Sequence, residues 1–158
     1  MTSHVTGVLR LLLVLIFAGA LLGQVLVPVI AHSYGQEYWE VEPLVVPYAA
    51  AGIAALVCFE VAIVAVWVLL GLVASGEVFT GRALRWVDAI IASGALAAAL
   101  CAGVGAHLTM VAGIGGPPAL LLLLGSLVGG AAFVLLMIVM RGLLETATAD
   151  RRELTEVI

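Results

Sequence analysis

The chain has 158 residues, of which 65% are hydrophobic and 10% are charged, and it carries a formal net charge of −4. Soluble domains are apolar over about one half of their residues and charged over about one quarter, so this composition excludes an ordinary soluble domain and indicates one small membrane domain over residues 1–158. The six cationic residues form no large basic patch, which excludes nucleic-acid binding, and two cysteines exclude a disulfide framework.

Four apolar segments are each long enough for a membrane-spanning helix, which needs about 20 residues. The run from Ala89 to Met140 has no charged side chain and is too long for one crossing. We expect it to break at residues 113–118, where glycine ends one helix and proline opens the next. The predicted fold is an all-α, integral membrane four-helix bundle with spans at about residues 11–31, 44–74, 88–112 and 117–140.

The first span leaves a second interpretation open, which is a cleaved signal peptide. Arg10 precedes an apolar run that leads to the small residues Ala18, Gly19 and Ala20, as at a cleavage site. Apolarity continues beyond that site further than the apolar core of a signal peptide does. A retained span is therefore favoured.

The arginines all fall on one side of the predicted spans. Positive residues accumulate in the segments that stay in the cytoplasm, and the loop between the first two spans holds Glu37, Glu40 and Glu42 but no cation. We therefore expect a plasma-membrane protein with both termini in the cytoplasm. The arginines are Arg10, Arg82, Arg85, Arg141, Arg151 and Arg152.

Glu60 lies inside the second span, where an ionised carboxylate costs roughly 2.5 to 3.5 kcal/mol on insertion scales. It is a neutral acid that holds helices together by a hydrogen bond, a proton or cation site, or a residue that senses a partner. Counting residues inward from the ends of the spans favours Ser126 or Gln24 as its partner and places His107 too far outward for direct contact. The intramembrane polar candidates are Glu60, Gln24, Ser126 and His107.

No sequence pattern indicates a metal site, a cofactor or a catalytic centre. His32 with the neighbouring acids lacks the spacing of metal ligands and is interpreted as part of a solvated loop. The HExxH, GxSxG and phosphate-loop signatures are absent from the sequence. We therefore expect a protein that is not an enzyme and that holds no metal or cofactor.

Two GxxxG motifs, at residues 19–23 and 125–129, allow helix backbones to approach closely. They are interpreted either as packing within the bundle or as a homo-oligomer interface. Both interpretations remain open, because four thin helices have many neighbours to satisfy.

The linker between spans two and three carries a helix-start signature, with Thr80 as the N-cap and Phe79 and Leu84 as a hydrophobic staple. Asp88 lies one turn after Arg85 and is expected to pair with it. The candidate residues of this inner linker are Phe79, Arg82, Arg85 and Asp88.

The C-terminal segment 141–158 has the pattern of an amphipathic helix that continues span four. One face would offer an apolar stripe to a partner helix. A helix lying on the membrane surface and a frayed tail are the alternatives. The stripe consists of Leu143, Ala147, Leu154, Val157 and Ile158.

Three segments together, VCFEVAIVAVWVLL, GEVFTGRALRWVDAII and RGLLETATADRRELTEVI, resemble the domain-of-unknown-function family 2975. Phe79, Asp88 and residues 153–158 match its recognisable pattern. The resemblance implies a small four-span bacterial plasma-membrane protein whose partner is a cytosolic helix-turn-helix regulator, and it implies no catalytic activity. The alternative function is an oligomeric channel or transporter subunit that uses Glu60.

Overall fold

The computed structural model describes residues 3–37, 42–76, 80–113 and 116–156, and the side chains of residues 5–33, 43–76, 80–113 and 116–149. The described residues form four long helices and one short π-helix, with no strand among them. The expected all-α bundle is therefore confirmed. The helices are α1 (Ser3–Glu37), α2 (Glu42–Ala74), α3 (Gly81–Ala106) and α4 (Gly116–Glu156), and the π-helix η1 (His107–Val111) follows α3 directly.

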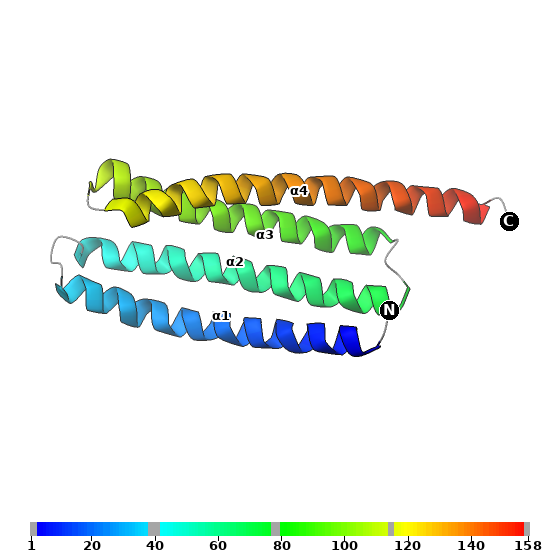
Figure 1. Ribbon diagram of the computed structural model, residues 1–158, viewed down its shortest axis with the longest axis horizontal. Helices are drawn as coiled ribbons and strands as arrows, with labels where there is room; N and C mark the ends of the chain where they lie inside the picture. The colour runs from blue at the N-terminus through cyan, green and yellow to red at the C-terminus, as the bar shows by residue number, and fades with distance from the viewer. Residues whose placement is uncertain (1–2, 38–41, 77–79, 114–115, 157–158) are drawn as a thin grey trace.

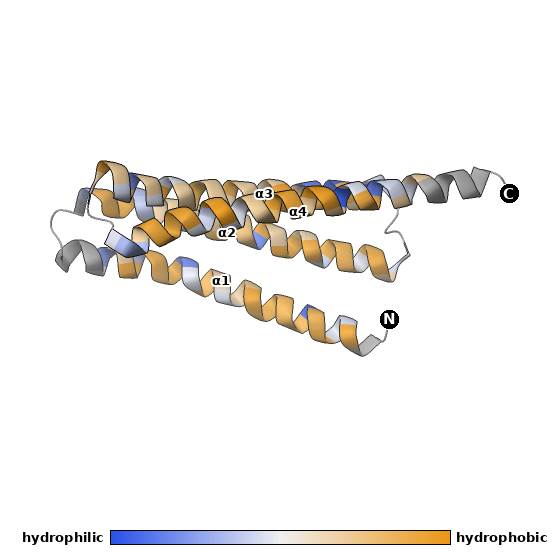
Figure 2. Cartoon of the chain, turned by 45° about the horizontal axis from the view of Figure 1, so that its top comes forward, coloured by the Kyte–Doolittle hydropathy of each residue, from blue (hydrophilic) through white to orange (hydrophobic). Residues whose placement is uncertain are grey.

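All four helices are long and apolar enough to cross a membrane. Hydrophobic colour covers most of each helix (Figure 2), and many large apolar side chains are exposed along their length. Such surfaces are suited to lipid hydrocarbon and not to water. The chain is therefore a multi-pass membrane protein, with candidate spans at Val5–Ser33, Pro43–Ala74, Gly81–Val111 and Gly116–Ala149.

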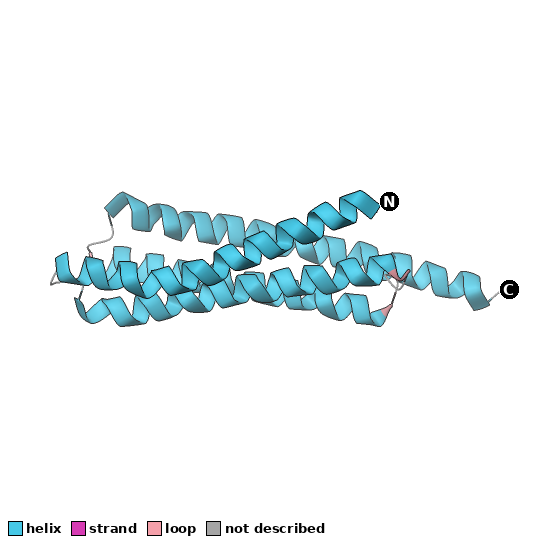
Figure 3. Cartoon of the chain, turned by 90° about the horizontal axis from the view of Figure 1, so that it is seen from below, coloured by secondary structure: helices cyan, strands magenta, loops and turns pink. Residues whose placement is uncertain are grey.

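The helices lie side by side and antiparallel in the order of the sequence (Figure 1). In the described ranges α2 packs between α1 and α3, and α3 packs between α2 and α4, whereas α1 contacts neither α3 nor α4. Both termini lie at the same end of the molecule (Figures 1 and 3), as four antiparallel helices require.

The helix boundaries follow local sequence signals. Thr80 stands in an extended conformation just before α3 and accepts a hydrogen bond at its backbone carbonyl from the N–H of Ala83, although its side chain does not cap the helix.

At the turn from η1 into α4, Gly113 and Gly116 adopt positive φ angles of 66° and 51°, which residues with a Cβ rarely adopt. Two prolines then occupy the first turn of α4, where their missing N–H groups cost nothing. The predicted break at residues 113–118 is thus confirmed, apart from residues 114–115, which lie outside the described residues.

Glycines bring α3 and α4 close together. A Cβ added to Gly105 would lie 2.8 Å from the backbone nitrogen of Leu123, and one added to Gly130 would lie 2.4 Å from the Cβ of Ala98. The two backbones approach at these points because neither glycine has a side chain.

The GxxxG motif of the fourth span does not take part in this packing. A Cβ added to Gly125 or to Gly129 would meet nothing within 4 Å, so both glycines face open space in the described chain. In the first span, a Cβ at Gly23 would meet the Leu56 side chain of α2 at 3.5 Å, whereas one at Gly19 would meet nothing within 4 Å. Packing within the bundle therefore explains only part of the first motif and none of the second.

Candidate functional site

Glu60 lies on the side of α2 that faces α1. Gly23 of α1 lies against Leu56, and Val27 lies against Gly52, so this antiparallel register places Glu60 opposite Gly19. The Oε1 atom of Glu60 is buried and has no hydrogen-bond partner among the described residues. A polar group without a partner is costly inside a membrane, which makes this acid the most unusual intramembrane residue of α2.

Neither side chain expected to pair with Glu60 donates a hydrogen bond to it. Ser126 donates to two carbonyls of its own helix, Leu122 at 2.6 Å and Leu123 at 3.0 Å, and α4 does not contact α2 in the described ranges. The Nε2 atom of Gln24 is buried without a partner, and Gln24 lies five residues from Gly19, about 7.5 Å along α1. These two expected partners are wrong, because Ser126 lies on a helix that does not neighbour α2 and Gln24 lies too far along α1.

His107 is hydrogen-bonded to a side chain of the neighbouring helix α2. Its Nδ1 atom lies 2.7 Å from the hydroxyl of Tyr48, and the two rings meet edge to face with centroids 5.9 Å apart. This bond joins α2 to the start of η1. Sequence reasoning missed it, although both residues lie near the ends of adjacent spans, at the end of the bundle opposite the chain termini, and so at similar depth.

The π-helix begins at His107. The N–H of Ala112 donates to the carbonyl of His107 at 2.9 Å, which is the five-residue spacing of a π-turn. The Thr109 hydroxyl donates to the carbonyl of Gly105 at 2.8 Å and so stays within its own helix. π-turns often occur at functional sites, and the first residue of this one, His107, is the residue that bonds to Tyr48.

At the other end of the membrane layer, Arg141 of α4 bonds to Asp88 of α3 through Nε and to Glu145 through Nη1 at 2.9 Å. The expected pairing of Asp88 with Arg85 is therefore wrong, because α4 passes beside Asp88 and supplies a closer guanidinium. Arg85, Arg82 and Trp86 instead line a surface cavity of about 360 Å³. Phe79, the fourth residue of the predicted inner linker, lies outside the described residues.

Arg10 and Trp67 form a second polar contact at the end of the bundle that holds Asp88 and Arg141. The guanidinium carbon of Arg10 lies 5.9 Å from the centroid of the Trp67 ring, in a cation–π arrangement. The register set by Tyr48 and His107 places Trp67 about level with Asp88. Arg10 and the Asp88–Arg141 pair thus mark one boundary of the apolar layer.

The helix α4 continues without a break to Glu156 and extends beyond the other three helices (Figure 1). Thr148 is only 6% exposed and lies near the level at which α3 begins, so the residues after it project past the bundle. Within the predicted stripe Leu143 is exposed and Ala147 is half-buried. The side chain of Leu154 is not described, and Val157 and Ile158 lie outside the described residues.

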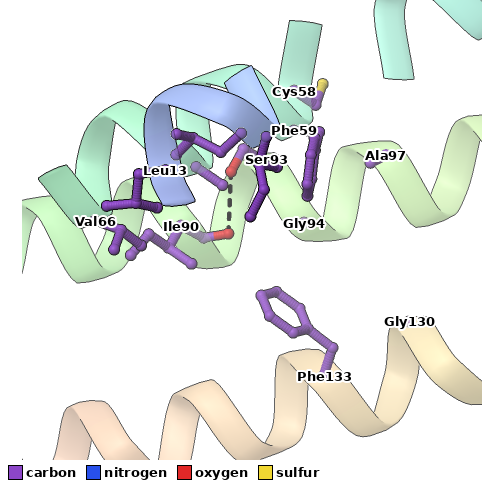
Figure 4. A pocket seen from close by; sticks show the side chains of 13 residues that line it. Leu13, Cys58, Phe59, Val66, Ile90, Ser93, Gly94, Ala97, Gly130 and Phe133 are labelled. Atoms are coloured by element: carbon purple, nitrogen blue, oxygen red, sulfur yellow. Dashed lines mark hydrogen bonds between the residues drawn. The ribbon is translucent and has the colours of Figure 1, made fainter. Parts of the chain in front are cut away.

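A groove of about 510 Å³ lies between the helices and is lined by residues of all four (Figure 4). Phe133 points from α4 toward Gly94 of α3, and Leu13 lines the groove from α1. Its one hydroxyl, on Ser93, donates to the carbonyl of Ile90 at 3.1 Å. The groove therefore offers hydrocarbon contact and no free polar group.

Among the described side chains no three His, Cys, Asp or Glu residues converge as metal ligands would.

A family described as "Protein of unknown function (DUF2975)" matches the chain over residues 29–158, which include α2, α3, α4 and the last part of α1. No curated protein and no solved structure matches the chain.

Proposed function

The chain belongs to the DUF2975 family, and on that premise we propose that it is a non-enzymatic plasma-membrane protein that binds a cytosolic partner through the end carrying both termini. The proposal assigns the arginine-rich end of the bundle to the cytoplasm, following the positive-inside rule. The partner class implied by the resemblance is a helix-turn-helix transcription regulator, which the protein would hold at the membrane.

The observation that carries this proposal is the continuity of α4. One helix runs from within the apolar layer to Glu156, and the eight residues after Thr148 extend it by about 12 Å past the start of α3. An isolated short helix is marginally stable in water, but this one is the continuation of a membrane-anchored helix. It can therefore present a fixed surface to a partner without first having to order itself.

The contact of Arg141 with Asp88 supports the same function. It fixes α4 to α3 about two turns before α4 passes the start of α3. A partner bound to the projecting segment would then be joined mechanically to the membrane-embedded helices.

The test is recovery of a helix-turn-helix regulator from the same organism with the full-length protein in native membranes. Leu154→Asp should abolish recovery, because burial of a leucine is worth roughly 1.5 to 3 kcal/mol. Arg152→Ala should barely reduce recovery, because the sequence pattern puts Arg152 on the charged face of the helix, and surface ion pairs contribute less than about 1 kcal/mol. Equal recovery with both variants, or no recovery with the unaltered protein, would overturn the proposal.

A second candidate function, an oligomeric channel or transporter subunit, is favoured by the buried and unpartnered Oε1 atom of Glu60. A carrier of protons or cations needs a group that ionises, and glutamine does not. On this account Glu60→Gln eliminates ion flux into proteoliposomes while the protein stays folded. Glu145→Gln, which changes an exposed acid near the end of the bundle, leaves flux unchanged. Normal flux with Glu60→Gln would exclude the transport role.

A further inference from the structure

The guanidinium of Arg10 contacts an aromatic ring but lacks a hydrogen-bond acceptor for its Nε atom among the described residues. Its Nε atom is buried and has no hydrogen-bond acceptor among the described residues, and its guanidinium contacts the Trp67 ring. A buried donor on a charged group costs free energy unless an acceptor reaches it. The side chain as a whole is half-buried, so a charged ligand can approach the guanidinium.

The three acids whose side chains are described lie elsewhere. Asp88 and Glu145 are bonded to Arg141, and α1 does not contact α3 or α4 in the described ranges. Glu60 lies on α2, but it is seven residues from Trp67, about 10.5 Å deeper along the helix. None of these three acids therefore neutralises the cation at this position.

An apolar groove of about 240 Å³ starts at the same tryptophan and runs deeper between α1 and α2. Trp67 belongs both to the groove and to the cation–π contact, so Arg10 lies at the groove's shallow end. The groove offers hydrocarbon and aromatic surface only. Its lining consists of Leu13, Val14, Phe17, Ile63, Val64 and Trp67.

We propose that this face of α1 and α2 is a binding site for one anionic phospholipid, with the lipid phosphate at Arg10 and an acyl chain in the groove below Trp67. The negative charge of the phosphate complements the guanidinium of Arg10, whose side chain is half-buried. The acyl chain covers the apolar lining. Basic pockets between helices at the membrane boundary are suited to anionic headgroups.

The two halves of the site make different demands on a ligand. A free phosphate ester would satisfy Arg10 but would leave the groove empty. A neutral lipid would fill the groove but would bring no net charge to Arg10. Only a molecule with an anionic headgroup and an attached chain uses both features.

The first experiment measures lipid retention by native mass spectrometry of the full chain in a neutral detergent, which presents no anionic surface. Phosphatidylglycerol should stay bound, whereas phosphatidylcholine with the same chains and glycerol phosphate alone should not. Arg10→Ala should weaken phosphatidylglycerol binding about tenfold or more, as loss of a hydrogen bond to a charged group does. Arg85→Ala removes the same charge from an exposed position outside this groove and should leave binding within about twofold.

The second experiment blocks the groove and keeps Arg10. Val64 is 45% exposed and lines the groove, and Val61 is 44% exposed on the same helix and does not. Val64→Trp should abolish retention of phosphatidylglycerol, whereas Val61→Trp should preserve it. This pair tests the site even if Arg10→Ala fails to fold.

Three results would overturn the assignment. Equal losses with Arg10→Ala and Arg85→Ala would show general charge attraction, and equal retention by the two tryptophan variants would show that the groove is not used. Binding of glycerol phosphate as tight as that of the lipid would identify a simple anion site.

Discussion

Hydroxyl side chains inside these helices bond to carbonyls of their own helix. Ser93, Thr109, Ser126 and Thr148 all follow this pattern, with acceptors three or four residues earlier in the chain. Such local bonds satisfy a hydroxyl without a neighbouring helix. Serine and threonine at membrane depth are therefore poor predictors of contacts between helices in this chain.

Glu60 and His107 show what sequence reasoning can and cannot supply at this scale. Counting residues predicts the depth of a side chain. It does not give the direction in which the side chain points or which helices are neighbours. The bond between Tyr48 and His107 depends on that direction, and Ser126 does not reach Glu60 because α4 does not contact α2 in the described ranges, so neither result could be derived from depth.

The bond between Tyr48 and His107 should contribute measurably to stability. Hydrogen bonds between membrane helices average about 0.6 kcal/mol and reach about 1.7 kcal/mol. We expect a coupling free energy in this range from a double-mutant cycle of Tyr48→Phe and His107→Ala, measured by unfolding in mixed micelles. Additivity within about 0.3 kcal/mol would show that the two side chains do not interact.

At the scale of helices, the breaks were predictable and the interfaces were not. The turn at Gly113 and Gly116 depends on local backbone geometry, which glycine and proline specify within a few residues. The interface between α3 and α4 depends instead on how each helix is rotated. Gly105 and Gly130 lie in it, whereas Gly125 and Gly129, which form the recognisable motif, do not.

Gly105 provides a direct test of that interface. An alanine there would place its Cβ 2.8 Å from the backbone of Leu123, which cannot move as a flexible side chain can. We expect Gly105→Ala to lower the free energy of unfolding by about 1 to 3 kcal/mol, as overpacking does.

Gly103→Ala is the matched control, because nothing lies within 4 Å of a Cβ at that position on the same helix. It should leave the free energy of unfolding unchanged or raise it by up to about 1 kcal/mol through helix propensity. Similar losses in both variants would mean that α3 and α4 do not approach closely at Gly105.

The whole molecule has both termini at one end (Figure 1), and the arginine distribution assigns that end to the cytoplasm. The termini share one end because an even number of helices, joined by short connections, runs back and forth across the layer. Their orientation in the membrane stays a prediction of the sequence.

Cysteine labelling in intact cells tests this orientation, in a background with Cys58→Ala and Cys101→Ala. A membrane-impermeant thiol reagent should label Gly35→Cys and should label Ala149→Cys only after permeabilisation. Ala149 is exposed, whereas Thr148 beside it is 6% exposed and would react poorly on either side of the membrane. Labelling of Ala149→Cys in intact cells would contradict the assigned orientation.

The packing of each helix on its neighbours in the sequence has a consequence for biosynthesis. In the described ranges every contact between the four long helices joins two that are consecutive in the chain, so the growing chain can complete each interface as soon as the next helix leaves the ribosome. No helix has to wait in the bilayer for a distant partner. The contact between α3 and α4 forms last, and the tail is therefore fixed in place only when the entire chain has been made.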